Sequence, residues 1–114
     1  MKNIKVVISV LLLLVCSQGN AGDIGLGTLK GVKVYDFPDD KVTRIYFNND
    51  ATHQDEASCQ GVGIITHSLH DEATTQKMLS IALSGYMSGK KVRAYSLASG
   101  SCEIYLISVQ DTYF

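Results

Sequence analysis

The hydrophobic and polar positions between residues 71 and 97 predict one amphipathic helix followed by a strand. Asp71 is a favourable N-cap, because its carboxylate can accept hydrogen bonds from the free amides of the first helical turn. Gly89 stands where a left-handed residue ends many helices. The sequence therefore predicts a helix over residues 72–88. Its expected apolar stripe, spaced i, i+3, i+4 and i+7, consists of Met78, Leu79, Ala82, Leu83 and Tyr86.

Small and polar side chains occupy the opposite side of this predicted helix, where Lys77 is followed by Ser80, Ser84 and Ser88. Gly85 lies in the middle of the helix, where glycine costs about 1 kcal/mol relative to alanine. Two explanations for this glycine stay open. The helix either packs closely on a strand or meets a helix of another subunit.

Three strands are predicted before the helix. Residues 31–37 and 42–47 flank a turn that contains Pro38, and together they indicate a hairpin. A polar loop over residues 48–58 separates this hairpin from a third strand, residues 61–67. The glycine-rich residues 22–29 are predicted to be a loose lead-in.

Two more strands are predicted after the helix. Residues 91–97 alternate well, a turn follows over 98–101, and residues 102–109 form an apolar strand that 111–114 could extend. The order of three strands, one helix and two strands predicts a mostly β, α+β protein. The expected architecture is a five- to six-stranded antiparallel OB-fold-like barrel with the helix between strands 3 and 4.

The first 21 residues have the organisation of a bacterial signal peptide. Lys2 and Lys5 precede an apolar segment, residues 6–15, which is too short to span a bilayer. Small residues favour cleavage before Gly22, so residues 1–21 are assigned to the signal peptide and 22–114 to a single domain. The protein is therefore expected to be exported, to the periplasm or beyond. Cys16 follows Val15 rather than a small residue, which argues against lipidation.

Charge and cysteine content narrow the function further. The formal net charge of −1 is spread along the chain, so we expect neither nucleic-acid binding nor membrane insertion. Two of the three cysteines, Cys59 and Cys102, lie outside the predicted signal peptide. In an oxidising compartment these two are expected to form a disulfide. Closing so long a loop stabilises a protein by about 4 kcal/mol in chain-entropy models.

The polar residues show no catalytic signature. His67 and His70 could share a metal ion only on a regular helix, and here they precede the helix, where their side chains are expected to diverge. His53 lies in an acidic loop with Asp55 that lacks the ligand spacing and central glycine of a calcium loop. No nucleophile-elbow motif accompanies the serines. We therefore predict a non-enzyme without metal or cofactor.

One segment resembles a known family. Tyr86 and Gly89 form an aromatic–x–x–Gly pattern at the predicted helix end, and Val92-Arg93 follows in the next strand. This unit resembles the B subunits of the subtilase cytotoxin and typhoid toxin group. Gly31-Val32 before a hairpin, Tyr46-Phe47 in its second strand and the Gly100-Ser101-Cys102 turn are also similar to secreted proteins of this kind.

The resemblance implies an OB-type barrel, secretion, ring-shaped homopentamers and binding of cell-surface glycans. The toxin members have a sugar-contacting serine just before the first strand, and Lys30 stands there in this chain, with Thr28 nearby. They also carry further cysteines and are longer. Exposed tyrosines suit sugar stacking, although cross-strand packing explains them as well. The candidate ligand-binding residues are therefore Thr28, Lys30, Tyr35 and Tyr46, with Tyr95 and Tyr105 as further exposed aromatics.

The leading prediction is an exported, non-enzymatic binding module that resembles the receptor-binding B subunit of AB5-type toxins. Its expected partners are a cell-surface glycan and further copies of the same chain, with the helix facing the axis of the ring. The alternative is a periplasmic protein–protein interaction module that has the same fold and does not bind sugar.

Overall fold

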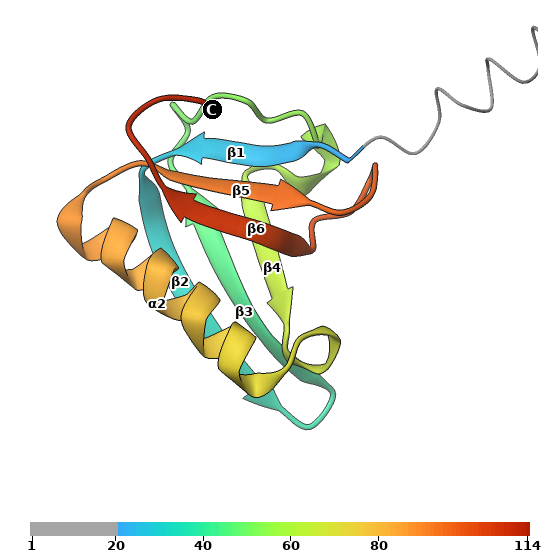
Figure 1. Ribbon diagram of the computed structural model, residues 1–114. Coiled ribbons are helices and arrows are strands. Elements are labelled where there is room, and N and C mark those ends of the chain that lie inside the picture. Colours follow the sequence, from blue (N-terminus) through green and yellow to red (C-terminus); the bar gives the residue numbers. More distant parts are fainter. Residues whose placement is uncertain (1–20) are drawn as a thin grey trace, which may run out of the picture.

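The computed structural model describes residues 21–114. The predicted signal peptide, including Cys16, lies outside the described residues apart from Ala21. The described chain consists of two three-stranded antiparallel sheets and one α-helix (Figure 1). This arrangement confirms the mostly β, α+β class.

The first sheet has the strand order β2–β3–β4. Strands β2 (Leu29–Phe37) and β3 (Asp40–Phe47) form the predicted hairpin, with Pro38 and Asp39 between them. Strand β4 (Val62–Thr66) pairs with β3 and is shorter than the predicted third strand. The chain leaves β4 through a short 3-10 helix, η2 (His67–Leu69), which contains the first of the two histidines before the helix.

The second sheet has the order β1–β5–β6, formed by β1 (Asp23–Gly27), β5 (Val92–Ser96) and β6 (Ile104–Val109). Only Thr28 separates β1 from β2, so the chain passes from one sheet directly into the other. Residues 91–97 show the predicted alternation, because Val92, Ala94 and Ser96 are buried.

The prediction of a loose lead-in at residues 22–29 was wrong, because this segment contains the fully buried strand β1. Its glycines allow close packing against the loop and strand that follow. A Cβ atom at Gly25 would lie 3.1 Å from the ring of Phe47, and one at Gly27 would lie 2.8 Å from Ala51. A strand that is buried on both faces carries no polar alternation, and the sequence pattern therefore missed it.

The two sheets also meet between β4 and the start of β6. The Ile64 amide donates to the Cys102 carbonyl at 2.9 Å, and Ile64 forms an isolated parallel bridge with Glu103. Cys59, at the end of the short 3-10 helix η1 (Ala57–Cys59), is bonded to Cys102 with 5.5 Å between the Cα atoms. The predicted disulfide pairing is therefore confirmed.

Helix α2 (Glu72–Ser88) has the predicted bounds. The Asp71 carboxylate accepts from the Thr74 amide at 2.7 Å, as an N-cap does. Gly89 ends the helix with φ +68°, in the left-handed region that favours glycine. Both caps read from the sequence are therefore present.

The predicted apolar stripe of α2 is only partly correct. Met78, Ala82 and Gly85 are the buried residues of the helix, whereas the predicted stripe members Leu83 and Tyr86 are 40% and 42% exposed. The reason is the close approach at Gly85. A Cβ atom there would lie 2.2 Å from Cγ2 of Val92, so the helix turns its smallest residues towards β5. Of the two explanations for Gly85, the structure favours close packing on a strand.

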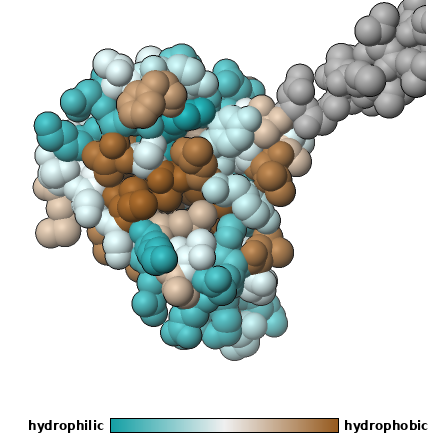
Figure 2. Space-filling view, viewed as in Figure 1, coloured by the Kyte–Doolittle hydropathy of each residue, from teal (hydrophilic) through white to brown (hydrophobic). Residues whose placement is uncertain are grey.

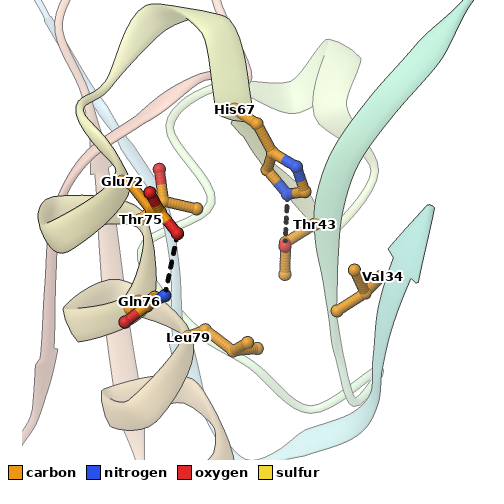
Figure 3. Close-up of a pocket in the computed structure, with 7 residues that line it drawn as sticks. All are labelled: Val34, Thr43, His67, Glu72, Thr75, Gln76 and Leu79. Carbon is orange, nitrogen blue, oxygen red and sulfur yellow. Dashed lines mark hydrogen bonds between the residues drawn. The ribbon is translucent and has the colours of Figure 1, made fainter. Parts of the chain in front are cut away.

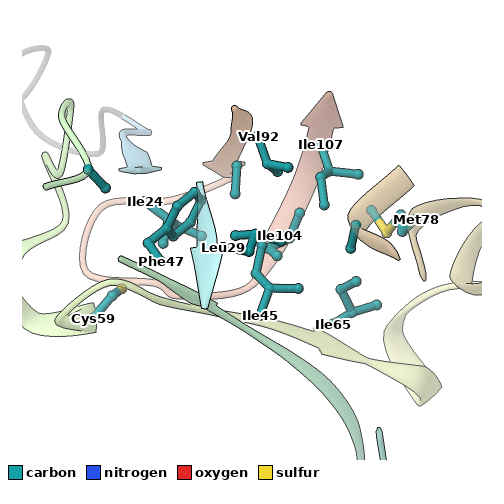
Figure 4. Close-up of a cluster of buried hydrophobic side chains, with 13 residues drawn as sticks. Ile24, Leu29, Ile45, Phe47, Cys59, Ile65, Met78, Val92, Ile104 and Ile107 are labelled. Carbon is teal, nitrogen blue, oxygen red and sulfur yellow. The ribbon is translucent and has the colours of Figure 1, made fainter. Parts of the chain in front are cut away.

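The hydrophobic core lies between the two sheets and the helix (Figure 4). Each strand of the two sheets and α2 contribute to it, and four isoleucines are completely buried. These are Ile24, Ile45, Ile65 and Ile104.

The C-terminal residues 111–114 do not extend β6, which ends at Val109. Instead, the Tyr113 hydroxyl donates to the buried carboxylate of Asp23 at 2.7 Å, and the Arg93 side chain donates to the Phe114 carbonyl. The hydrogen bond to Asp23 raises the pKa of Tyr113. These side-chain contacts hold the tail against β1 and β5 and take the place of strand pairing.

We expect Gly85→Ala to lower the free energy of unfolding by about 1–3 kcal/mol, the usual cost of overpacking a core. The new methyl group would overlap the completely buried side chain of Val92, which outweighs the better helix propensity of alanine. Urea denaturation measures the loss. Ser84→Ala is the matched control on the exposed side of the helix, with an expected change within about 0.5 kcal/mol. A Gly85→Ala protein as stable as the wild type would contradict this packing.

The disulfide is expected to protect both cysteines from alkylation in the oxidised protein. Without prior reduction, iodoacetamide should modify neither Cys59 nor Cys102, and mass spectrometry reads the result. Replacing both by alanine should reduce the free energy of unfolding by roughly 4 kcal/mol in the chain-entropy account. Alkylation of both thiols before reduction would show that the bridge is absent.

Candidate ligand-binding site

The outward face of the β2–β3–β4 sheet carries the predicted tyrosines. Register pairs place Gly31 opposite Tyr46 and Lys33 opposite Arg44, and side chains directly opposite one another share a face. Tyr35 lies on the same face, because residues two apart in a strand point the same way. The other face of β3 carries buried residues of the core, so the tyrosine face is turned away from it.

Tyr35 and Tyr46 come together on this face. Their hydroxyl oxygens are 3.2 Å apart, within hydrogen-bond distance. The Arg44 guanidinium lies 4.7 Å from the centroid of the Tyr35 ring, and the Lys33 ammonium lies 5.2 Å from that of Tyr46. Each ring therefore carries a cation over one face, in the geometry of a cation–π contact. We call Lys33, Tyr35, Arg44 and Tyr46 the tyrosine cluster.

Two neighbours extend the tyrosine cluster along the hairpin. Phe37 is 62% exposed, and its ring centroid lies 6.3 Å from that of Tyr35. The Asp40 carboxylate lies 3.7 Å from the Arg44 guanidinium and partly neutralises its positive charge. The cluster therefore combines exposed aromatic surface with hydroxyls and partly compensated cations.

The hydrogen bond between the two hydroxyls shifts the pKa values of the two tyrosines in opposite directions. The hydrogen bond from Tyr46 is the main cause that lowers the pKa of Tyr35, and Lys33 and Arg44 lower it further. The same hydrogen bond raises the pKa of Tyr46, because a phenol that donates to its neighbour holds its proton more tightly. Tyr35 is therefore the first of the pair to ionise.

The other two predicted site residues lie at the start of β2. The Thr28 hydroxyl accepts a hydrogen bond from the Asn48 side chain at 2.8 Å, which joins the β1–β2 junction to the loop after β3. Lys30 is exposed and precedes Gly31, the register partner of Tyr46. Lys30 lies at the register irregularity between Leu29 and Gly31, and Thr28 makes a structural contact. Tyr95 and Tyr105 belong to the β1–β5–β6 sheet and do not join the cluster.

The three histidines have separate partners. The Nε2 atom of His67 lies 2.9 Å from the Thr43 hydroxyl, and that of His70 lies 3.2 Å from the Glu103 carboxylate. His53 stacks on the ring of Tyr113 at 3.9 Å between centroids. Residues 21–114 contain no group of three or more side chains that could hold a metal ion.

Sequence reasoning missed the cations of the tyrosine cluster and the role of Glu103. The register that brings Arg44 across from Lys33 cannot be read from the sequence. Glu103 accepts hydrogen bonds from the Thr66 amide at 2.8 Å and from the Thr66 hydroxyl. The sequence feature that could have indicated this role is that Glu103 is the only charged residue of the predicted strand 102–109.

Comparisons of the chain with protein-family models, curated proteins and solved structures found no match. In the part of the chain that the structure describes, no helix is both long and apolar enough to cross a membrane.

We expect Tyr46→Phe to raise the pKa of Tyr35, because the variant removes the hydroxyl that donates to the Tyr35 phenolate. An NMR titration of the tyrosine Cζ resonances follows each ring separately. Tyr95→Phe is the control on the other sheet and should leave the pKa of Tyr35 unchanged. A lower or unaltered Tyr35 pKa in Tyr46→Phe would show that the two hydroxyls do not interact.

Proposed function

We propose that this protein is an exported, non-enzymatic binding module that resembles the receptor-binding B subunit of AB5-type toxins. Its ligand is a carbohydrate, which binds at the tyrosine cluster. The observation that carries this proposal is the pairing of Tyr35 and Tyr46 on adjacent strands, with hydroxyls 3.2 Å apart and a cation over each ring.

The chemistry of the cluster suits a sugar. Aromatic rings offer apolar surface with a polar edge, which matches the mixed faces of a pyranose. One face of each ring is covered by a cation, so the sugar contacts are the remaining ring surface, the hydroxyls and the cationic groups. The exposed ring of Phe37 enlarges this surface at one end.

The strand connections support an OB-type barrel as part of the same proposal. The nearly continuous β1–β2 pairs with β5 through its first half and with β3 through its second half. Strand β4 then meets β6 in parallel at Ile64, and helix α2 lies between β4 and β5. OB-folds bind oligosaccharides on the face of their second and third strands. With β1–β2 counted as the first strand, Arg44 and Tyr46 lie on the second.

A second candidate function is a protein–protein interaction module without sugar binding. Figure 2 shows a hydrophobic patch over β6 and the neighbouring part of α2. Exposed apolar residues from these elements are Leu83, Met87, Leu106 and Val109. Contiguous exposed apolar surface often marks a protein contact. This patch favours a protein partner, whereas the tyrosine cluster favours a sugar.

A glycan array separates the two functions. We expect the wild-type protein to bind a subset of sialylated or neutral glycans. Tyr35→Ala and Tyr46→Ala should each weaken binding at least tenfold, because each removes a ring and its cation contact. Tyr86→Ala is the matched control, since Tyr86 is an exposed tyrosine on α2, outside the tyrosine cluster. Absence of binding across the array would favour the protein–protein module.

We further propose that the protein forms a cyclic homo-oligomer with α2 facing the axis. The exposed side of α2 carries Ser80, Ser84 and Ser88. The hydroxyls of Ser80 and Ser88 donate to backbone carbonyls one turn earlier, at 2.9 and 2.6 Å. A face whose hydroxyls are satisfied within the helix loses little on contact with a neighbouring helix.

Light scattering after size exclusion tests the ring. A mass of several chains at micromolar concentration is expected, and a mass near one chain would contradict the ring. Ser84→Glu should weaken assembly, because it brings like charges together around the axis. Asp55→Ala, which changes the charge of an exposed loop residue, should leave the mass unchanged.

A further inference from the structure

A pocket of about 300 Å³ lies between the β2–β3 hairpin and the first half of α2 (Figure 3). It is on the opposite face of the hairpin from the tyrosine cluster, because Val34 and Thr43 form a register pair that alternates with Lys33 and Arg44. The residues that line it come from β2, β3, η2 and α2. They are Val34, Thr43, His67, Glu72, Thr75, Gln76 and Leu79.

Two aliphatic side chains form apolar walls of the pocket, Val34 on the hairpin and Leu79 on the helix (Figure 3). Val34 is 56% exposed, although Thr43 directly opposite it is 1% exposed. The hairpin thus reaches past the part of the core that α2 covers, and it leaves apolar surface in contact with solvent. A ligand that covers Val34 would gain from removing this surface from water.

The polar groups of the pocket lie around these walls. The Thr43 hydroxyl and the Nε2 atom of His67 already share a hydrogen bond of 2.9 Å. The Gln76 amide is 3.5 Å from the Glu72 carboxylate, at the limit of a hydrogen bond. The Thr75 hydroxyl oxygen is shielded from solvent and has no partner within the described residues. The Glu72 carboxylate is therefore the strongest acceptor in the pocket that can take further hydrogen bonds.

The charge of the pocket favours a cationic ligand. Glu72 is exposed and makes no ion pair within residues 21–114. It lies in the first turn of α2, where the positive end of the helix dipole is located. Lys41, whose register partner is Asp36 on the hairpin, forms an ion pair with Asp36, and this contact lowers the pKa of Asp36. Lys41 therefore does not compensate Glu72.

We infer that this pocket binds a small organic amine. Its hydrocarbon body contacts Val34 and Leu79, and its ammonium group lies beside the Glu72 carboxylate. A volume of about 300 Å³ is at the lower end of the range for ligand pockets, so it accommodates a single ring or a short chain. This site is independent of the sugar site, and either can fail without the other.

Three probes with the same body and different charge test the inference. Benzylamine, benzyl alcohol and benzoate are titrated separately into the ¹⁵N-labelled protein. We expect benzylamine to shift the amide resonances of Val34, Thr43 and Leu79, with an affinity about threefold above that of benzyl alcohol, as for an exposed charge pair. Benzoate should bind most weakly, because the carboxylate of Glu72 repels it.

Glu72→Gln removes the charge and keeps the shape, so benzylamine should then bind no more tightly than benzyl alcohol. Asp50→Asn makes the same change of net charge at an exposed loop residue outside the pocket and should keep the threefold preference. The inference is overturned if benzoate binds as tightly as benzylamine or if Glu72→Gln keeps the preference. It is also overturned if the probes shift amide resonances of the tyrosine cluster and not those of the pocket. A further contradicting result is that a second copy of the chain covers the pocket and no probe shifts the resonances of the pocket residues.

Discussion

The contact between β4 and β6 is the interaction on which the arrangement of the two sheets depends. On one side, the chain itself joins the sheets at the β1–β2 junction. On the other side, the link is the Cys59–Cys102 disulfide and the hydrogen bond from the Ile64 amide to the Cys102 carbonyl. Glu103 strengthens this link. Its side chain is only 12% exposed, and its carboxylate accepts hydrogen bonds from the amide and the hydroxyl of Thr66. The same carboxylate lies 3.2 Å from Nε2 of His70. Without this link, the sheets would be joined by the β1–β2 junction, by the core and by the hydrogen bonds between β1 and the loop that follows β3.

This contact orients both candidate binding surfaces. Strand β4 is held against β6, and β3 and β2 follow it in antiparallel register. The hairpin therefore projects beyond the core with two accessible faces. Its outer face presents Tyr35 and Tyr46, and its inner face presents Val34 to the pocket beside α2. One two-stranded element thus supports two chemically different surfaces, one aromatic and cationic and the other aliphatic and acidic.

The sequence predicted those features that depend on local chemistry. The caps of α2 follow from Asp71 and Gly89, and the hairpin follows from alternation around Pro38. The disulfide was predicted from the cysteine count together with the expectation of an oxidising compartment. Features that depend on tertiary packing were not predictable. Strand β1 is buried on both faces and shows no alternation, and Gly85 rotates the buried side of α2 towards Val92.

The candidate site was predictable to a similar extent. The sequence indicated Tyr35 and Tyr46 as candidate sugar-stacking residues on two strands of one hairpin, but it could not supply the register between β2 and β3. That register brings the two hydroxyls together and sets Arg44 over the ring of Tyr35. The pocket beside α2 depends on how far the hairpin extends past the core, which no local pattern encodes.

Amide hydrogen exchange along β4, in oxidised and reduced protein, tests most directly whether the β4–β6 contact holds the sheets together. The amides of Ile64 and Thr66 face β6, whereas those of Gly63 and Ile65 face β3 by the alternation of an antiparallel strand. Reduction of the disulfide should accelerate exchange at Ile64 and Thr66 by tenfold or more and affect Gly63 and Ile65 much less. Equal acceleration at all four amides, or none at Ile64 and Thr66, would contradict this account.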